Sequence, residues 1–113
     1  MPDEPYKVYE MPEDVKRVRD ALAANAREAW PREEHGDFAD SAVYTRPVTE
    51  ATACETDKAG TWLVGPNFEG FGGCMIRRPD GTWWYREPID GRDSKMKRGE
   101  VEALANCACW FTG

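Results

Sequence analysis

Residues 74–87, CMIRRPDGTWWYRE, carry the clearest structural signal in the chain, which is that of a β-hairpin. Two runs rich in apolar and aromatic residues flank the tripeptide PDG at 79–81. Proline, aspartate and glycine in this order suit a type I turn followed by a glycine in the left-handed conformation. We therefore expect an antiparallel hairpin in which Arg78 pairs with Thr82.

This register places large side chains on both faces of the hairpin. Ile76 then lies opposite Trp84, and Met75 lies opposite Tyr85. Trp83 and Trp84 are adjacent on one strand, so their side chains must point to opposite faces. We expect one face to pack on the core of the protein and the other to be covered by a partner or a ligand.

Upstream of the hairpin, residues 12–30 are expected to form a long helix. Pro12 suits the first helical position. On the exposed side, Arg17 is placed to pair with Glu13 or Asp14. Apolar residues recur every three or four positions, which gives one buried stripe: Val15, Val18, Leu22, Ala26 and Ala29.

Shorter elements complete the predicted fold. Residues 42–48 and 61–64 are expected to form strands, and Pro47 either places the first of them at a sheet edge or ends it early. A second helix is expected over 97–106, followed by a short strand in the tail at 107–111. The fold class is α+β: one long N-terminal helix packed on a small antiparallel sheet of three to five strands, with a short C-terminal helix.

The length and composition favour one domain spanning residues 1–113, with 1–11 as an extended arm. The hydrophobic share of 41% excludes general disorder. No apolar stretch is long enough to span a membrane, and the N-terminus does not resemble a secretory signal. We therefore expect a cytoplasmic protein. Ten arginines against five lysines are typical of a bacterial protein from a GC-rich genome.

The net charge of −6 is unevenly distributed. Residues 1–57 hold 14 acidic and 7 basic side chains, whereas residues 58–113 hold 7 and 8. An acidic chain repels nucleic acid, so no nucleic acid partner is expected. The segment 77–98 is locally basic and is a candidate site for a carboxylate or a phosphate. Its cations are Arg77, Arg78, Arg86, Arg92, Lys95, Lys97 and Arg98.

The four cysteines, Cys54, Cys74, Cys107 and Cys109, match zinc-site spacing poorly, because their only close pair is C-x-C. No metal and no cofactor is expected. Disulfides are disfavoured by the expected cytoplasmic location, which leaves free and mostly buried thiols as the favoured state. A redox-active pair at Cys107 and Cys109 is an alternative.

Two loops hold candidate functional residues. His35 is the only histidine and lies among carboxylates, so it is the candidate general base if the protein is an enzyme. The glycine-rich loop 65–73 matches no phosphate-binding motif, but its Phe68 and Phe71 could close over a ligand.

Five tryptophans in so short a chain are more than a small core easily buries. We expect a binding protein that holds a peptide, a protein segment or a small natural product in a groove lined by aromatic and arginine side chains. A homodimer, with the groove near the subunit interface, would explain the surplus apolar surface. The expected ligand-binding residues are Trp83, Trp84, Tyr85, Arg77, Arg86, Phe68 and Phe71.

Two other classes of function remain open at this point. One is a cofactor-independent tailoring enzyme that performs a ring closure, addition or isomerisation on a modified peptide or natural product, mainly by orienting its substrate. The other is an acidic inhibitor or immunity-type protein whose N-terminal half docks on a basic partner protein.

Overall fold

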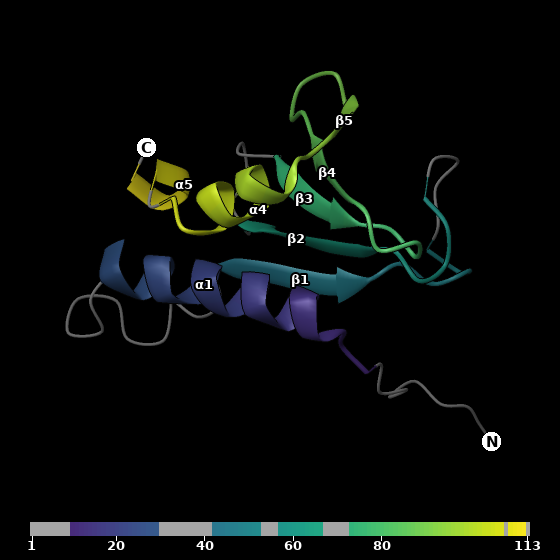
Figure 1. Cartoon of the computed structure of the whole chain (residues 1–113), viewed down its shortest axis with the longest axis horizontal. Coiled ribbons are helices and arrows are strands. Elements are labelled where there is room, and N and C mark those ends of the chain that lie inside the picture. Colours follow the sequence, from purple (N-terminus) through teal and green to yellow (C-terminus); the bar gives the residue numbers. More distant parts are fainter. Residues whose placement is uncertain (1–9, 30–41, 53–56, 67–72, 108, 113) are drawn as a thin grey trace.

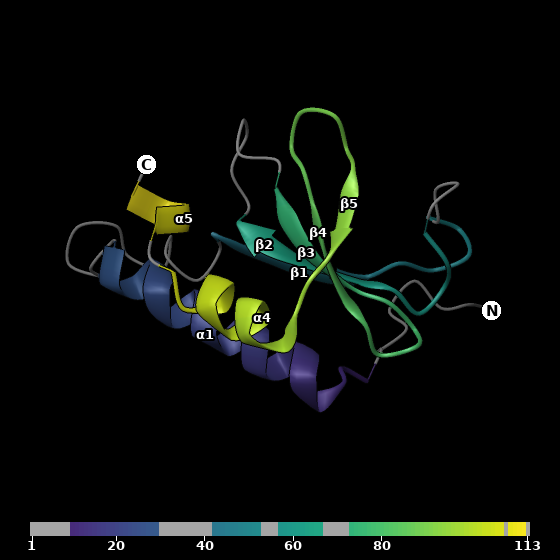
Figure 2. The ribbon, with the colours of Figure 1, turned by 45° about the horizontal axis from the view of Figure 1, so that its top comes forward.

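A computed structural model describes residues 10–29, 42–52, 57–66, 73–107 and 109–112. Within these ranges a five-stranded antiparallel sheet has the strand order β1-β2-β3-β4-β5. The three helices of the described residues pack on one face of the sheet (Figures 1 and 2). This architecture confirms the predicted α+β class. The elements are α1 (Glu13–Ala29), β1 (Val43–Pro47), β2 (Trp62–Pro66), β3 (Cys74–Arg77), β4 (Trp83–Arg86), β5 (Asp93–Lys95), α4 (Arg98–Ala105) and α5 (Cys109–Thr112).

The β3–β4 hairpin has the predicted register. Met75 lies opposite Tyr85, and Ile76 lies opposite Trp84. The N–H of Arg78 donates to the carbonyl oxygen of Thr82 over 2.9 Å and closes the turn. Gly81 has a φ of 89°, the left-handed conformation that glycine adopts without a Cβ clash.

The core lies between the helices and one face of the sheet. The apolar stripe of α1 is buried as predicted, since Val15, Val18 and Leu22 are each 0% exposed. Burial of this stripe against the sheet removes apolar surface from water and so stabilises the fold. The sheet and the C-terminal helices contribute Trp62, Val64, Met75, Trp83, Val101, Ala105, Trp110 and Phe111 to the same cluster.

Strand β1 forms one edge of the sheet, as its proline predicts. The N–H of Val48 donates to the carbonyl oxygen of Thr61 over 2.6 Å. Backbone groups alternate in direction along an antiparallel strand, so the backbone nitrogen of Pro47 faces away from β2. Its missing N–H therefore costs the sheet no hydrogen bond.

Three local predictions differ from the structure. Strand β5 was not expected, because its sequence DSK has no apolar alternation. The tail forms helix α5 instead of a strand. Trp110 and Phe111 are both buried, whereas adjacent residues on a strand would point to opposite faces. Arg17 pairs with Glu102 of α4, 85 residues away, and not with a neighbour on its own helix.

Candidate functional site

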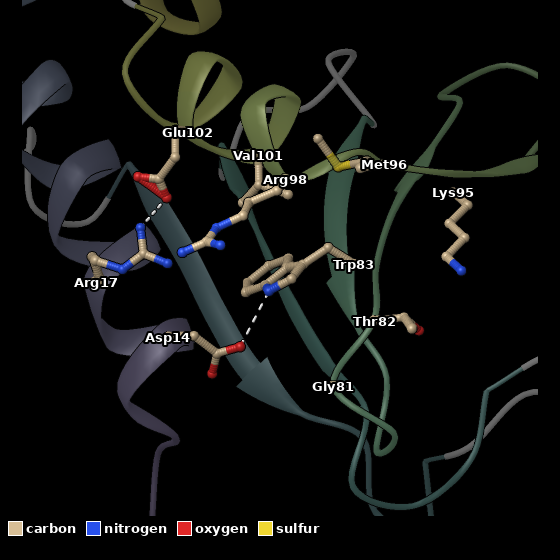
Figure 3. Close-up of a pocket in the computed structure, with 10 residues that line it drawn as sticks. All are labelled: Asp14, Arg17, Gly81, Thr82, Trp83, Lys95, Met96, Arg98, Val101 and Glu102. Carbon is tan, nitrogen blue, oxygen red and sulfur yellow. Dashed lines mark hydrogen bonds and ion pairs between the residues drawn. The ribbon is translucent and has the colours of Figure 1, made fainter.

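A pocket of about 640 Å³ lies where α1, α4 and the end of the β3–β4 hairpin meet. Figure 3 shows the side chains that line it. A volume of this size falls within the range of small-molecule and peptide sites. The lining residues are Asp14, Arg17, Gly81, Thr82, Trp83, Lys95, Met96, Arg98, Val101 and Glu102.

Asp14 holds the floor of this pocket in place. Its Oδ2 accepts a hydrogen bond from the indole Nε1 of Trp83 and another from Nε of Arg77, each over 3.1 Å. The helix places Asp14 in the first turn of α1, where a negative charge is also favoured by the helix dipole. The carboxylate is therefore already engaged by two donors from the sheet.

The second carboxylate of the pocket is also engaged. Glu102 of α4 accepts a hydrogen bond from Nη1 of Arg17 on α1. Both side chains are about half exposed, 55% for Arg17 and 49% for Glu102. The pair bridges the two helices across the mouth of the pocket (Figure 3).

Two cations of the pocket have no such partner. Within the described ranges, neither Lys95 nor Arg98 makes a hydrogen bond or an ion pair with another side chain. In Figure 3 the guanidinium group of Arg98 points toward that of Arg17, whereas Lys95 stands at the rim and points away from both. Because both carboxylates are engaged by other donors, the guanidinium group of Arg98 is the positive charge that the described residues leave unpaired inside the pocket. Its chemistry suits an anion.

The sheet divides the residues that the sequence predicts as one binding groove. The register places Trp83, Tyr85 and Arg77 on the face that the helices cover. Trp84 and Arg86 point to the opposite face. Of this set, Trp83 alone lines the pocket described above, so the predicted residues do not share one surface.

On the opposite face, the arginines are already paired with carboxylates. Arg86 donates to Asp57 and to Asp93, each over 2.8 Å. Arg78 donates to Asp93 over 2.8 Å and lies 4.1 Å above the ring of Trp84. Hydrogen bonds from Arg86, opposed by partial burial, hold the pKa of Asp93 below its ordinary value. The hydrogen bonds that Arg86 donates to Asp93 and Asp57 raise the pKa of its guanidinium group. These ion pairs stabilise the fold, and they leave neither Arg78 nor Arg86 unpaired to bind an anionic ligand.

Of the two cysteines whose side chains are described, Cys74 and Cys107, one differs from its predicted state. Cys74 has a free thiol, and burial raises its pKa to about 11. Cys107 is disulfide-bonded, with its bonding partner outside the described side chains. This corrects the expectation of free thiols, which rested on an assumed reducing compartment and not on geometry. The cytoplasmic location therefore stays a prediction.

Several predicted residues lie outside the described part of the chain. These are His35, Phe68, Phe71 and Cys54, together with most of the 1–11 arm. Among the described residues, no group of three or more potential ligands is placed to hold a metal ion.

Sequence reasoning missed Asp14, Arg17 and Glu102 as pocket residues. Lys95 and Arg98 belong to the basic segment that predicted an anion site. Asp14, Arg17 and Glu102 come to the pocket through contacts between residues that are 63 to 85 positions apart in the sequence. Charge patterning along one helix carries no signal for such contacts.

Comparison of the chain with known protein families, curated proteins and solved structures finds no match. No helix among the described residues is both long and apolar enough to cross a membrane.

Proposed function

We propose that this chain is a binding protein whose pocket between α1 and α4 holds an anionic ligand, either a peptide or a carboxylate-bearing natural product. The observation that carries the proposal is the charge balance of the pocket. Arg98 lines it with no side-chain partner among the described residues, while Asp14 and Glu102 are each engaged by a donor of the protein.

The geometry of the pocket supports this ligand class. An arginine guanidinium binds a carboxylate through two parallel hydrogen bonds, and the groups of Arg98 and Arg17 lie on the same side of the pocket (Figure 3). Trp83, Met96 and Val101 supply an apolar wall for the rest of the ligand. The ligand would thus be held by charge at one end and by apolar contact at the other.

The proposal is tested with pairs of N-acetylated peptides that differ only at the C-terminus, free carboxylate in one and amide in the other. Binding is followed by NMR on the uniformly ¹⁵N-labelled protein, using the indole N–H of Trp83 and the Nε–H of Arg98. We expect the carboxylate peptides to bind more tightly than their amides, and high salt to weaken their binding.

Arg98→Ala should weaken binding of the carboxylate peptides by about tenfold or more, because a hydrogen bond to a charged group is lost. Arg92→Ala is the matched control, since Arg92 is an exposed arginine that pairs with Asp90 outside the pocket. Equal binding of carboxylate and amide peptides would reject the anion site. The anion site would also be rejected if neither these peptides nor inorganic phosphate shifted the NMR signals of Trp83 and Arg98.

The homodimer belongs to the same proposal, as do the cytoplasmic location and the absence of a nucleic acid partner. The net charge of −6 supports the last of these. The enzyme alternative remains a prediction, because its candidate base His35 lies outside the described residues. The inhibitor alternative also remains a prediction.

A further inference from the structure

A second, apolar groove of about 530 Å³ runs between α4 and strand β5. It opens beside β5 because Ser94, on the helix-covered side of that strand, has a small side chain. The groove ends at the sheet edge, where the described part of the chain places no further strand (Figure 2). Its walls are Tyr85, Ser94, Lys95, Met96, Glu100, Ala103, Leu104 and Cys107.

Among the described residues, no backbone group pairs with the outer edge of β5 beside this groove. The N–H of Met96 donates to Trp83, and the carbonyl of Arg92 accepts from Glu87, each over 2.9 Å. Residues 92, 94 and 96 therefore direct their backbone groups toward β4. By the same alternation, Asp93 and Lys95 direct theirs away from the sheet.

We propose that a second copy of this chain pairs with this edge, β5 against β5, around a twofold axis at Ser94. Antiparallel pairing around Ser94 places Asp93 of each copy opposite the partner's Lys95. In such a pair the two residues exchange both backbone hydrogen bonds, which gives four hydrogen bonds across the interface. The pairing puts no like charges opposite each other, since each Lys95 faces an Asp93 carboxylate of the other copy, which Arg78 and Arg86 of that copy also bind.

The other sheet edge is less suited to this pairing. On β1 the outward-facing residues include Pro47, which has no N–H to donate. On β5 both outward-facing residues have N–H groups and their side chains have opposite charges. A joined pair of β5 strands also brings the two apolar grooves together at the same interface, where the exposed Ala103 and the half-buried Leu104 are removed from water. The proposal identifies an interface for the homodimer and does not depend on the ligand of the anion pocket.

The first measurement is the molar mass of the full-length protein by light scattering over a concentration series. We expect twice the chain mass of 12.8 kDa at high concentration, falling toward the monomer on dilution. A monomeric mass throughout overturns the proposal, and it leaves the ligand proposal to be decided by the peptide titrations alone.

Two variants then locate the interface. Lys95→Glu places a like charge opposite the partner's Asp93, and Ala103→Glu puts a charge into the apolar groove. Both side chains are exposed, so the fold of the single chain is retained, as circular dichroism should show. Each variant should raise the dimer dissociation constant by about tenfold or more.

Ala51→Glu is the matched control, because Ala51 is equally exposed but lies between β1 and β2. It should dimerise as the natural chain does. A dimer that tolerates both Lys95→Glu and Ala103→Glu would place the interface elsewhere and overturn the proposal. The same conclusion follows if Ala51→Glu disrupts the dimer as strongly as they do.

Discussion

Replacing Asp14 by alanine should destabilise the fold more than replacing any exposed aspartate of the same helix. Asp14 is the one acceptor shown for the indole N–H of Trp83, and it also accepts from Arg77, each over 3.1 Å. It therefore ties the start of α1 to the sheet. Asp14→Ala removes this tie, together with the hydrogen bond that the backbone N–H of Val15 donates to Oδ1 of Asp14 over 2.9 Å.

The expected loss follows from the exposure of the three side chains. Trp83 is 9% exposed, so its indole N–H would be left without an acceptor, at a cost of about 1–3 kcal/mol. The Arg77 and Asp14 side chains are 21% and 30% exposed, so water partly screens their ion pair and it contributes about 1 kcal/mol or less. The free energy of unfolding should fall by about 2–3 kcal/mol.

Urea unfolding followed by circular dichroism measures this loss, and an unchanged m-value shows that the unfolded reference is the same. Asp20→Ala is the control, because Asp20 pairs with Arg19 on the surface of the same helix and its side chain is 57% exposed. That variant should lose less than about 0.5 kcal/mol. Asp14→Asn should fall between the two, since an amide oxygen still accepts from the indole. If Asp14→Ala and Asp20→Ala are equally stable, the argument that Asp14 holds α1 on the sheet is refuted.

Three further predictions concern single sites. Cys74, whose pKa burial raises from 9.0 to about 11, should be alkylated with a pH–rate midpoint near 11; a midpoint near 9 would contradict its burial. The hydrogen bond from Arg86 lowers the pKa of Asp93 in the folded state. The stability that this bond contributes is therefore fully present above the unfolded-state pKa of about 3.9, and it is lost as the pH falls through the folded-state pKa. The gap in unfolding free energy between the natural chain and Asp93→Asn should therefore narrow below about pH 4, and a constant gap would argue against this pairing. Gly81→Ala should cost about 1 kcal/mol because its φ is 89°, whereas Gly99→Ala in α4 should stabilise by about 0.5–1 kcal/mol. Urea unfolding of both variants checks this pair, and a change of the same sign in each would contradict it.

Local signals in the sequence were sufficient for most of the fold. The turn at 79–81 fixed the hairpin register, because its length and glycine leave few alternatives. The period of the α1 stripe identified the buried face of the helix. Strand β5 and helix α5 were not predictable in this way. Each is three or four residues long, and a segment that short has no measurable period.

The pocket was only partly predictable, for a related reason. The basic composition of residues 77–98 predicted an anion site, and Arg98 of that segment does line the pocket. Which of its cations remain free depends on the carboxylates that fold against them. Arg86 was expected in the groove, but Asp57 and Asp93 neutralise it. The pairing of Arg86 with Asp57 joins residues 29 positions apart, and the composition of the chain does not reveal such a contact.

The net charge of the protein therefore says little about what its pocket attracts. At −6 the chain repels large polyanions, but the charge that a small ligand meets is set within a few ångströms, because salt screens more distant charges over about 8 Å. On the face of the sheet opposite the helices, Arg78 and Arg86 are held by Asp93 and Asp57. At the α1–α4 pocket the carboxylates accept from other donors, and no side chain of the described residues pairs with Arg98. The proposed anion site would thus offer a positive charge to a small anion on a chain of negative net charge, because the carboxylates beside it already accept hydrogen bonds from other residues.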